Sequence, residues 1–391
     1  CGGCKWQNIA YEKQLDFKHS EVANNIKRIG GFSEFEEVPI LGAPDQYFYR
    51  NKMEFSFSNA RWLTQYEISS EENFGNRDAL GFHIPGMWSK ILDLKECWLQ
   101  EDPSNKIRLA VKNYAVENGL EFYDVKEQKG FLRTLMLRQN SKGEWMVLFQ
   151  LYKDNKAERM KLFDYLLMMF PHITSLVYAI NPKGNDSIYD LDIQNYYGDG
   201  FLYEEMNGLQ FKIGPKSFFQ TNYKQALELY RKTLEFADLK GNEVVYDLYT
   251  GTGTIAQYVA RNAKQVIGIE SVQEAIDAAI EHAELNGLQN TTFYCGDMKN
   301  VFNDEFLASH PKADVLITDP PRDGMHQKVV EQILKLSPER IVYVSCNSAT
   351  QARDIALMKE DYDLIKILPV DMFPQTHHVE NIALLIKKVK A

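Results

Sequence analysis

Strand-like and helix-like segments alternate regularly after Gly214, and this alternation constrains the fold more than any other feature of the sequence. Short apolar runs favour strands, and the amphipathic stretches that follow them favour helices. Strands are predicted at 244–248, 266–270, 292–294, 315–318 and 340–345, and helices over 218–236 and from about 255, 272, 327 and 349. This order predicts an α/β fold with a mostly parallel sheet and helices on both faces.

The end of the chain departs from this alternation. Two further strands, predicted at 364–370 and 379–388, are joined by a loop that is too short to contain a helix. Strands joined in this way pair antiparallel, because a parallel connection needs a long crossover. The sequence therefore predicts a terminal antiparallel strand pair on an otherwise parallel, Rossmann-like sheet.

The first part of the chain has a different pattern, with short alternating apolar segments that are rich in aromatic side chains. Segments at 55–57, 131–137 and 145–152 predict antiparallel strands, and helices are expected over 11–28 and 105–117. A further strand pair over 201–213 turns at Asn207-Gly208, which is a typical hairpin sequence. We therefore expect two domains, a β-rich α+β central domain over 1–210 and the α/β domain over 211–391.

The charge balance argues against a polyanionic partner. The chain has 391 residues, with 44 lysines and arginines against 54 aspartates and glutamates, so its formal net charge is −10. Nucleic-acid-binding proteins usually carry a basic excess, although a local basic patch can be enough. No long, uninterrupted apolar run is present, so no membrane-spanning helix is expected. We expect a cytoplasmic protein that acts as a monomer.

A glycine-rich turn follows the first strand of the α/β domain. Gly251 and Gly253 lie in the run 249–254, where they would let the backbone approach a ligand closely. Ala256 stands where a dinucleotide fingerprint has glycine, and the lysine of a phosphate-binding loop is absent. The turn therefore favours a ligand without phosphates; the alternative is a tight connection between strand and helix without a ligand.

Acidic residues end four consecutive strands that meet at one edge of the predicted sheet: Asp247, Glu270, Asp297 and Asp319. Glu270 follows Gly251 by 19 residues, where a carboxylate can accept hydrogen bonds from both hydroxyls of a ribose. Asp297 could meet an adenine amino group. A cationic nucleoside without phosphates, S-adenosylmethionine, fits this set, whereas the alternative is solvated carboxylates at strand ends.

Arg322 and Cys346 are candidates for chemistry at the same edge. Arg322, in the run 319–322, stands where methyltransferases that act on amino groups usually have an aromatic residue, and it could hold a phosphate or a uracil carbonyl. Cys346 ends the fifth strand before a helix, and both the helix N-terminus and Arg322 would favour its thiolate. The alternative for Cys346 is a buried structural cysteine, and Cys295 is expected to lie in the core.

Glu380 follows two histidines in the loop between the last two strands. We interpret it as a general base, because a carboxylate at the reaction edge can take up a proton. The run of His377, His378 and Glu380 could instead be a metal site, but three ligands at such tight spacing make a poor set.

Four motifs stand out together: Ser-Phe-Phe-Gln-Thr-Asn at 217–222, Asp-Pro-Pro-Arg at 319–322, Ser-Cys-Asn at 345–347 and Phe-Pro-x-Thr-x-His-x-Glu at 373–380. They resemble the RNA uracil-5-methyltransferases, which form 5-methyluridine from S-adenosylmethionine. The resemblance spans essentially the whole chain and implies a class I methyltransferase sheet. It also implies that Cys346 is the nucleophile that adds to C6 of uracil and that Glu380 removes the C5 proton.

The same resemblance implies which residues contact the cofactor: Gln220, Tyr249, Thr254, Glu270, Asp297 and Asp319, beside the backbone of Gly251. Family members often carry asparagine at the positions of Thr254 and Asp297, so this sequence departs from the pattern there. The target base has to leave the RNA stack to reach such a pocket.

Cys1-Gly-Gly-Cys4, followed by Gln7, Tyr11 and Gln14, resembles the iron–sulfur segment of the ribosomal-RNA branch of the family. That branch holds a 4Fe–4S cluster on four cysteines, so Cys1, Cys4 and the distant Cys97 are the expected ligands. The fourth ligand would lie upstream, since the chain lacks an initiator methionine and is expected to begin inside a longer protein, where a basic TRAM domain could also lie. A lone CxxC pair also has zinc and redox interpretations.

The cysteine segment favours 23S ribosomal RNA as the substrate, and transfer RNA is the alternative. Candidate RNA contacts in the central domain are Tyr49, Arg50, Asn51, Lys52, Arg133 and Arg138, which could equally be surface charges and strand aromatics. Two rival functions stay open: a methyltransferase for DNA or a small molecule on this fold, and a catalytically idle RNA-binding or assembly factor.

Overall fold

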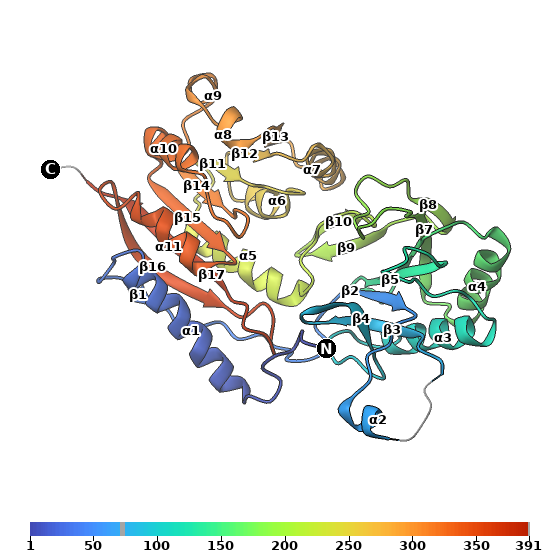
Figure 1. Ribbon diagram of the computed structural model, residues 1–391. Helices are drawn as coiled ribbons and strands as arrows, with labels where there is room; N and C mark the ends of the chain where they lie inside the picture. The colour runs from blue at the N-terminus through green and yellow to red at the C-terminus, as the bar shows by residue number, and fades with distance from the viewer. Residues whose placement is uncertain (71–74, 390–391) are drawn as a thin grey trace. The chain divides into compact units, whose positions relative to one another are not determined.

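The computed structural model describes residues 1–70 and 75–389. The chain folds into two compact units (Figure 1). The first unit contains residues 1–4, 47–204 and 212–217, and the second contains 5–46, 205–211 and the chain from Phe218 onward. Within the described ranges, no helix is both long and apolar enough to cross a membrane.

The second unit is built on one mixed sheet. Its strands are β1 (Glu36–Glu37), β11 (Val244–Leu248), β12 (Gln265–Glu270), β13 (Thr291–Cys295), β14 (Val315–Thr318), β15 (Arg340–Ser345), β16 (Tyr362–Val370) and β17 (Glu380–Lys387). In the described residues they lie in the order β1-β16-β17-β15-β14-β11-β12-β13. Neighbours from β13 to β15 are parallel, whereas β17 is antiparallel to β15 and β16. The predicted α/β fold with its terminal antiparallel pair is confirmed.

Helices cover the faces of this sheet (Figure 1). They are α1 (Tyr11–Arg28), α5 (Tyr223–Ala237), α6 (Thr254–Ala260), α7 (Gln273–Leu285), α8 (Met298–Val301), α9 (Asp304–Ser309), α10 (Gln327–Leu336) and α11 (Ser348–Ala356). One buried core joins α1, α10 and α11 to the strands, through side chains such as Ile26, Ile333 and Ile355. Helix α5 packs on β15 and β17, and α6 and α7 pack on β12 and β13.

The N-terminal segment belongs to the sheet of the second unit, although the sequence analysis expected it in the first domain. Val22 and Ile26 of α1 are completely buried in the core of that sheet. Strand β1 extends the same sheet, since Glu36 pairs in parallel with Lys366 of β16. Burial of this apolar helix face stabilises the N-terminal segment against residues more than 300 positions away, and helical periodicity carries no information about such a partner.

The first unit is built on a second sheet. Its strands are β2 (Lys52–Ser58), β3 (Ala79–Ile84), β4 (Met87–Asp93), β5 (Leu132–Gln139), β6 (Trp145–Leu151), β7 (Ile173–Ile180) and β8 (Gln194–Tyr197), and its helices are α2 (Gln65–Ser69), α3 (Ser104–Glu117) and α4 (Lys156–Met169). The strand order in the described residues is β4-β3-β2-β5-β6-β7-β8. The strands pair antiparallel as predicted, except that β6 and β7 are parallel and are joined through α4.

A hairpin of β9 (Leu202–Met206) and β10 (Leu209–Ile213) lies where the chain passes between the two units. Its turn residues Asn207 and Gly208 have φ values of 51° and 71°. Positive φ at both central positions is typical of the type I′ turn that Asn-Gly favours. The predicted hairpin is therefore present at the expected residues.

Candidate active site

The turn between β11 and α6 uses left-handed backbone at its glycines. Gly251 has φ of 56° and Gly253 has φ of 75°. A Cβ added to Gly253 would lie 2.9 Å from the Cβ of Ala279, so only glycine fits there, whereas nothing lies within 4 Å of the same position on Gly251. Tyr249 has φ of 63°, which is an uncommon conformation for an aromatic residue. Strain and open space at the carboxyl end of a strand are typical of a ligand site.

Glu270 ends β12 beside this turn, and hydrogen bonds fix both of its carboxylate oxygens. Oε2 accepts from the amide of Gly251 at 3.2 Å. Oε1 accepts from the amides of Ser271 and Val272, at 2.6 and 3.1 Å, just before α7. The structure thus brings Glu270 and Gly251 together, and the remaining lone pairs of the carboxylate are free to accept from hydroxyl groups of a ligand.

Asp247 is close enough to Asp319 for its charge to raise the pKa of Asp319. Asp247 is 1% exposed and accepts a hydrogen bond from the Thr250 hydroxyl at 2.5 Å. Burial raises the pKa of Asp247 to about 7. Burial, and after it the charge of Asp247, raises the pKa of Asp319 to about 7 as well. An opposite charge favours the ionised form of a carboxyl group, so this pair suits a positively charged ligand.

Tyr249 and Asp297 are close to this group. Burial raises the pKa of Tyr249, and the charges of Asp354, Asp297 and Glu270 raise it further. Asp297 is half-exposed and caps α8, where it accepts from the amide of Lys299 at 3.1 Å and pairs with its Nζ at the same distance. An adenine contact by Asp297 would have to share the carboxylate with this lysine.

Thr254 and Gln220 are the remaining residues expected to bind the cofactor. Thr254 is the first residue of α6, and its hydroxyl lies 3.3 Å from the hydroxyl of Tyr230. Gln220 is partly buried in the non-helical segment just before α5, which begins after the capping residue Asn222. The motif 217–222 therefore leads directly into a capped helix of the second unit.

The loop after β14 is fixed by its neighbours in the sheet. The amide of Gly324 donates to the carbonyl of Pro321 at 2.8 Å, and Gly324 has φ of 75°. The carbonyl of Arg322 accepts from the side-chain amide of Asn347 at 3.0 Å and from the hydroxyl of Thr350 at 3.1 Å. Both donors stand at the start of α11, so the loop that carries Arg322 is attached to the turn that carries Cys346.

Cys346 is partly buried between β15 and α11. Burial, followed by the charges of Glu380 and Asp319, raises the pKa of its thiol to about 11. Arg322 opposes them through its charge and through a hydrogen bond to the thiol. Arg322 thus lowers the thiol pKa as expected from the sequence. Burial and two carboxyl groups outweigh it, however, so the net shift is upward and not the expected decrease.

Glu380 is the first residue of β17 and is 8% exposed. Burial, and after it the charge of Asp319, raises its pKa to about 8, while Arg322 lowers it. A carboxyl group whose pKa lies near neutrality is poised to take up a proton. The structure thus brings Cys346, Glu380, Asp319 and Arg322 within electrostatic reach of one another at one edge of the sheet.

The histidines beside Glu380 make no metal site. The rings of His377 and His378 lie 4.1 Å apart, and Nδ1 of His378 lies 3.4 Å from Nη2 of Arg322. Among residues 1–70 and 75–389, no group of three histidine, cysteine or acidic side chains is arranged to hold a metal ion. His378 instead stands next to the arginine that contacts the thiol.

The three cysteines expected at an iron–sulfur cluster belong to the first unit but do not complete a site. Cys1 is exposed, and Cys4 and Cys97 are partly buried. Burial raises the pKa of the Cys4 thiol, and Cys97 adds to this increase, so these two thiols are near each other. In the part of the chain that the structure describes, these thiols do not form a group of three side chains that could hold a metal ion. The set present therefore does not fit a cluster by itself.

Cys295 is exposed rather than buried, so its expected place in the core is wrong. It ends β13, which is the last strand of the sheet, and an edge strand leaves side chains uncovered.

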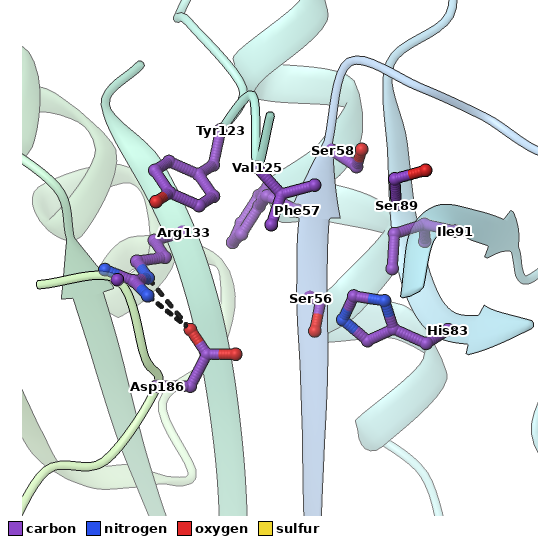
Figure 2. Close-up of a pocket in the computed structure, with 11 residues that line it drawn as sticks. Ser56, Phe57, Ser58, His83, Ser89, Ile91, Tyr123, Val125, Arg133 and Asp186 are labelled. Atoms are coloured by element: carbon purple, nitrogen blue, oxygen red, sulfur yellow. Dashed lines mark hydrogen bonds and ion pairs between the residues drawn. The ribbon is translucent and has the colours of Figure 1, made fainter. Parts of the chain in front are cut away.

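Two of the arginines expected to contact RNA are buried instead. Arg133 is 2% exposed, donates to the carbonyls of Asn181, Lys183 and Asn185, and pairs with Asp186. Figure 2 shows this ion pair on one side of a cavity of about 40 Å³, which Tyr123 and His83 also line. Arg138 is 3% exposed and donates to the carbonyl of Ser217.

Tyr49 and Asn51 are buried as well, so that only Arg50 and Lys52 of the expected RNA contacts keep partly exposed side chains. Burial leaves these two, like Arg133 and Arg138, little side-chain surface for contact with RNA, and it also rules out the alternative that the two arginines are surface charges.

Asn347, Thr350 and Tyr230 are site residues that the sequence analysis missed. Asn347 was recognised only as part of a motif, although an asparagine just before a helix is typical of a cap, and it does accept from the amide of Ala349 at 3.1 Å. Tyr230 of α5 is buried near three carboxyl groups, those of Asp319, Asp247 and Glu380. Nothing in the helical pattern of α5 distinguishes Tyr230 from an ordinary core residue.

Comparisons with known proteins agree over nearly the whole chain. A model of the tRNA (Uracil-5-)-methyltransferase family matches residues 192–388. A Bacteroides thetaiotaomicron protein named an uncharacterized RNA methyltransferase is 52% identical over 389 residues, which are 98% of this chain and 86% of the relative. A Porphyromonas gingivalis protein of the same description is 50% identical over 397 residues, covering 100% of this chain and 85% of the relative.

One solved structure is similar in both fold and sequence. It is the crystal structure of the Pyrococcus abyssi tRNA (uracil-54, C5)-methyltransferase in complex with S-adenosyl-L-homocysteine. Its TM-score with this chain is 0.78 at 30% sequence identity, and the match covers 98% of this chain and 85% of that one.

Proposed function

This chain belongs to the RNA uracil-5-methyltransferase family, and we propose that it methylates C5 of a uridine in RNA through a covalent adduct on Cys346. It is an S-adenosylmethionine-dependent RNA methyltransferase. The observation that carries the finer proposal is the grouping of Cys346, Arg322 and Glu380 at the carboxyl edge of one sheet.

The glycine turn and the carboxyl groups around it fit S-adenosylmethionine. Open space beside Gly251, a fixed carboxylate at Glu270 and the acidic pair of Asp247 and Asp319 suit a cationic nucleoside without phosphates. The residues that we propose to hold it are Gln220, Tyr249, Gly251, Thr254, Glu270, Asp297 and Asp319. When bound, S-adenosylmethionine supplies an electrophilic methyl group.

Cys346 starts the proposed reaction as a thiolate that attacks C6 of uracil. The new bond between Sγ and C6 moves the electron pair of the C5–C6 double bond to C5 and the O4 carbonyl, so that C5 becomes nucleophilic and accepts the methyl group. Arg322 favours the thiolate by its charge and its hydrogen bond to the thiol. Its exposed side also suits a uracil carbonyl or a phosphate.

Glu380 then completes the reaction as the general base. It removes the proton from C5, the electron pair of the broken C5–H bond restores the C5–C6 double bond, and Sγ leaves C6 with the electron pair of its own bond. Cys346 is thereby returned as a thiolate, and the ring carries one methyl group in place of one proton. The raised pKa of about 8 lets the Glu380 carboxylate hold this proton near neutral pH.

We propose a uridine of 23S ribosomal RNA as the target, on the resemblance of the cysteine segment. Transfer RNA is the second candidate, because the similar Pyrococcus abyssi enzyme is named for uracil 54 of tRNA. Mapping of 5-methyluridine by mass spectrometry in ribosomal and transfer RNA from a deletion strain distinguishes them. We further propose that the chain acts in the cytoplasm as a monomer, since one unit of a single chain supplies all the residues proposed to bind the cofactor and to carry out the reaction.

A 4Fe–4S cluster on Cys1, Cys4 and Cys97 is a proposal from the resemblance alone. Cys4 and Cys97 are near each other, but the described residues hold no group of three side chains that could bind a metal ion, so the structure adds no support for a cluster. No step of the reaction above is assigned to a cluster.

Two substitutions test the reaction. With a uridine-containing RNA and labelled S-adenosylmethionine, Cys346→Ala is expected to abolish methyl transfer, and Glu380→Gln is expected to accumulate a protein–RNA adduct that resists denaturation. Cys295→Ala is the control, since this exposed thiol lies outside the reaction group and its loss should leave the rate unchanged. A Cys346→Ala protein with a normal rate contradicts the covalent mechanism, and a chain that never methylates RNA favours the assembly-factor alternative.

A further inference from the structure

The loop that leads to Glu380 is held by the N-terminal helix of the chain. This loop runs from Asp371, which follows β16, to Val379, which precedes β17. Its contacts with α1 join residues more than 350 positions apart in the sequence, and all of them lie within the second unit. Three positions of the loop are fixed in this way, at Asp371, Phe373 and Gln375.

Gln14 of α1 and Gln375 of the loop form a reciprocal pair. The Gln14 side-chain oxygen accepts from the main-chain amide of Gln375 at 2.9 Å, and its Nε2 donates to the Gln375 side-chain oxygen at 2.9 Å. Gln375 has φ of 68°, a conformation that a residue with a side chain adopts at a cost in energy. Both side chains are almost completely buried, so water cannot replace these bonds. Gln14 therefore holds the loop at a residue with strained backbone, and its Nε2 also donates to the main-chain carbonyls of Trp6 and Ile9, at 3.1 and 2.9 Å.

Lys18 and Asp371 form a second, fully buried attachment. Lys18 Nζ lies 2.5 Å from Asp371 Oδ1, and both side chains are 0% exposed. Lys18 also donates to the carbonyl of Phe373 at 3.2 Å, and the hydroxyl of Tyr11 donates to Asp371 Oδ2 at 2.8 Å. A buried ion pair is a poor source of stability but a specific one, because it is tolerated in only one arrangement.

These contacts give Tyr11 and Gln14 a place in the protein that the sequence analysis did not foresee. The sequence placed both residues in an iron–sulfur segment. In the structure, Tyr11 bonds to Asp371 and Gln14 bonds to Gln375. They contact the loop that ends at Glu380, whose main chain is set by pairing with Val370. The sheet sets the main chain of Glu380, and the attachments at Asp371 and Gln375 fix the loop that leads into it and carries His378.

We propose that Gln14 and Lys18 are positioning residues that hold the Glu380 loop in place for removal of the C5 proton. The proposal rests on the proposed function and adds a specific step to it. Loss of the attachment affects the second half of the reaction, in which Glu380 acts, more than the first half, in which Cys346 adds to C6. General bases are effective only within hydrogen-bond reach of their proton, so a small displacement of the loop is enough.

The Gln14→Leu substitution tests this with two RNA substrates. With uridine RNA, we expect turnover to fall roughly tenfold or more and the Cys346 adduct to accumulate, as it should in Glu380→Gln. With 5-fluorouridine RNA no C5 proton is present, and methylated adduct should form at a rate within about twofold of the wild-type rate. A substitution that merely loosens the fold would slow both substrates alike, and that outcome overturns the proposal.

Matched variants keep the experiment decisive. Asn290→Ala is the control in the same unit, because Asn290 also donates to two main-chain carbonyls, those of Ala260 and Ala263, and has no contact with the loop. It should change the rate with neither RNA substrate.

Gln14→Asn shortens the side chain by one carbon and covers the case in which the leucine variant does not fold. Normal turnover without adduct in this variant also overturns the proposal. If the wild-type protein forms no adduct on 5-fluorouridine RNA, the proposed function itself fails.

Discussion

The side-chain amide of Asn347 donates a hydrogen bond of 3.0 Å to the main-chain carbonyl of Arg322. The hydroxyl of Thr350 lies 3.1 Å from the same oxygen and 3.1 Å from the main-chain carbonyl of Asn347, so its one hydrogen is shared between these two acceptors. Through these two bonds the turn after Cys346 and the loop after Asp319 form one rigid group, although they follow different strands. The distance between the thiol and the guanidinium that stabilises its thiolate is therefore set by α11 and not by Arg322 alone.

Thr350→Val should weaken this group. Valine has a similar shape but no hydroxyl, so the Arg322 carbonyl loses one donor at a cost of about 1 kcal/mol. We expect turnover to fall several-fold and the unfolding midpoint in urea to decrease slightly. Thr350→Ser keeps the hydroxyl and serves as the control, with near wild-type behaviour expected. Equal losses in both variants would show that the methyl group of Thr350 matters and the hydrogen bond does not.

Arg322→Ala should make Cys346 less reactive towards iodoacetamide. Alkylation follows the thiolate fraction, and the pKa of this thiol is already raised to about 11 by burial and by two carboxyl groups. Removal of the opposing arginine raises the pKa further, so the rate at pH 8 should fall by about tenfold per unit of pKa. Peptide mass spectrometry separates Cys346 from the exposed thiols of Cys1 and Cys295.

Glu380→Gln should change the same rate in the opposite direction, because the charge that disfavours the thiolate is removed. The effect should be present above about pH 8, where Glu380 is ionised, and absent near pH 6, where it is protonated. A decrease in both variants would mean that alkylation reports on access to the thiol and not on its charge.

Turnover of the wild-type protein should rise with pH between pH 6 and 9, and less steeply above about pH 8, because the thiolate fraction of Cys346 still increases there. The base must be ionised to take the C5 proton, and burial together with Asp319 raises the pKa of Glu380 to about 8. Below this value the ionised fraction falls about tenfold per pH unit, and the thiolate fraction of Cys346 falls in the same direction. Initial rates between pH 6 and 9 at saturating RNA measure this, and a rate that is constant below pH 7 contradicts the assignment of Glu380.

The parallel part of the sheet could be predicted from the sequence because most of its strands are apolar runs that are followed by a helix. The strand order also predicts that Gly251, Glu270 and Asp319 lie close together, since residues at the carboxyl ends of parallel strands meet at one edge of the sheet. The last two strands were predictable for the same reason, since the loop from Asp371 to Val379 leaves no room for a crossover. The local sequence pattern was sufficient to predict the pairing of strands that follow one another closely in the chain.

Long-range burial could not be predicted in this way. Lys18 reads as a surface lysine of an amphipathic helix, yet it is 0% exposed because Asp371, from the other end of the chain, neutralises it. Arg133 reads as a nucleic-acid contact, yet three loop carbonyls and Asp186 occupy its donors. The raised pKa of the Cys346 thiol is a similar case, because it depends on the number of carboxyl groups that fold around the thiol.

Glu270→Gln should weaken cofactor binding. The carboxylate is fixed by the amides of Gly251 and Ser271, and a neutral amide accepts hydrogen bonds from hydroxyl groups less strongly. We expect the dissociation constant for S-adenosylhomocysteine, measured by calorimetry, to rise roughly tenfold or more, as for a hydrogen bond to a charged group. Asp297→Asn is the comparison, with a smaller change expected because Asp297 is half-exposed and paired with Lys299. A larger effect at Asp297 would reverse the proposed ranking of the two residues.

Asp247→Asn should stabilise the protein at pH 8 and much less at pH 5. Burial raises the folded-state pKa of Asp247 to about 7 from its ordinary value of 3.8. Its neutral form is therefore the stable one, and its contribution is fully present below about pH 4 and is lost as the pH rises through about 7. At pH 8 the ionised carboxylate costs a few kcal/mol, which asparagine avoids while its oxygen still accepts from Thr250. Urea unfolding at both pH values measures the difference in the free energy of unfolding.

A cation next to Asp247 lowers its pKa. Saturating S-adenosylmethionine should therefore reduce the extra stability of the Asp247→Asn variant at pH 8, and S-adenosylhomocysteine, which lacks the sulfonium charge, should not. An advantage that is independent of pH would mean that the wild-type carboxyl group does not titrate in this range.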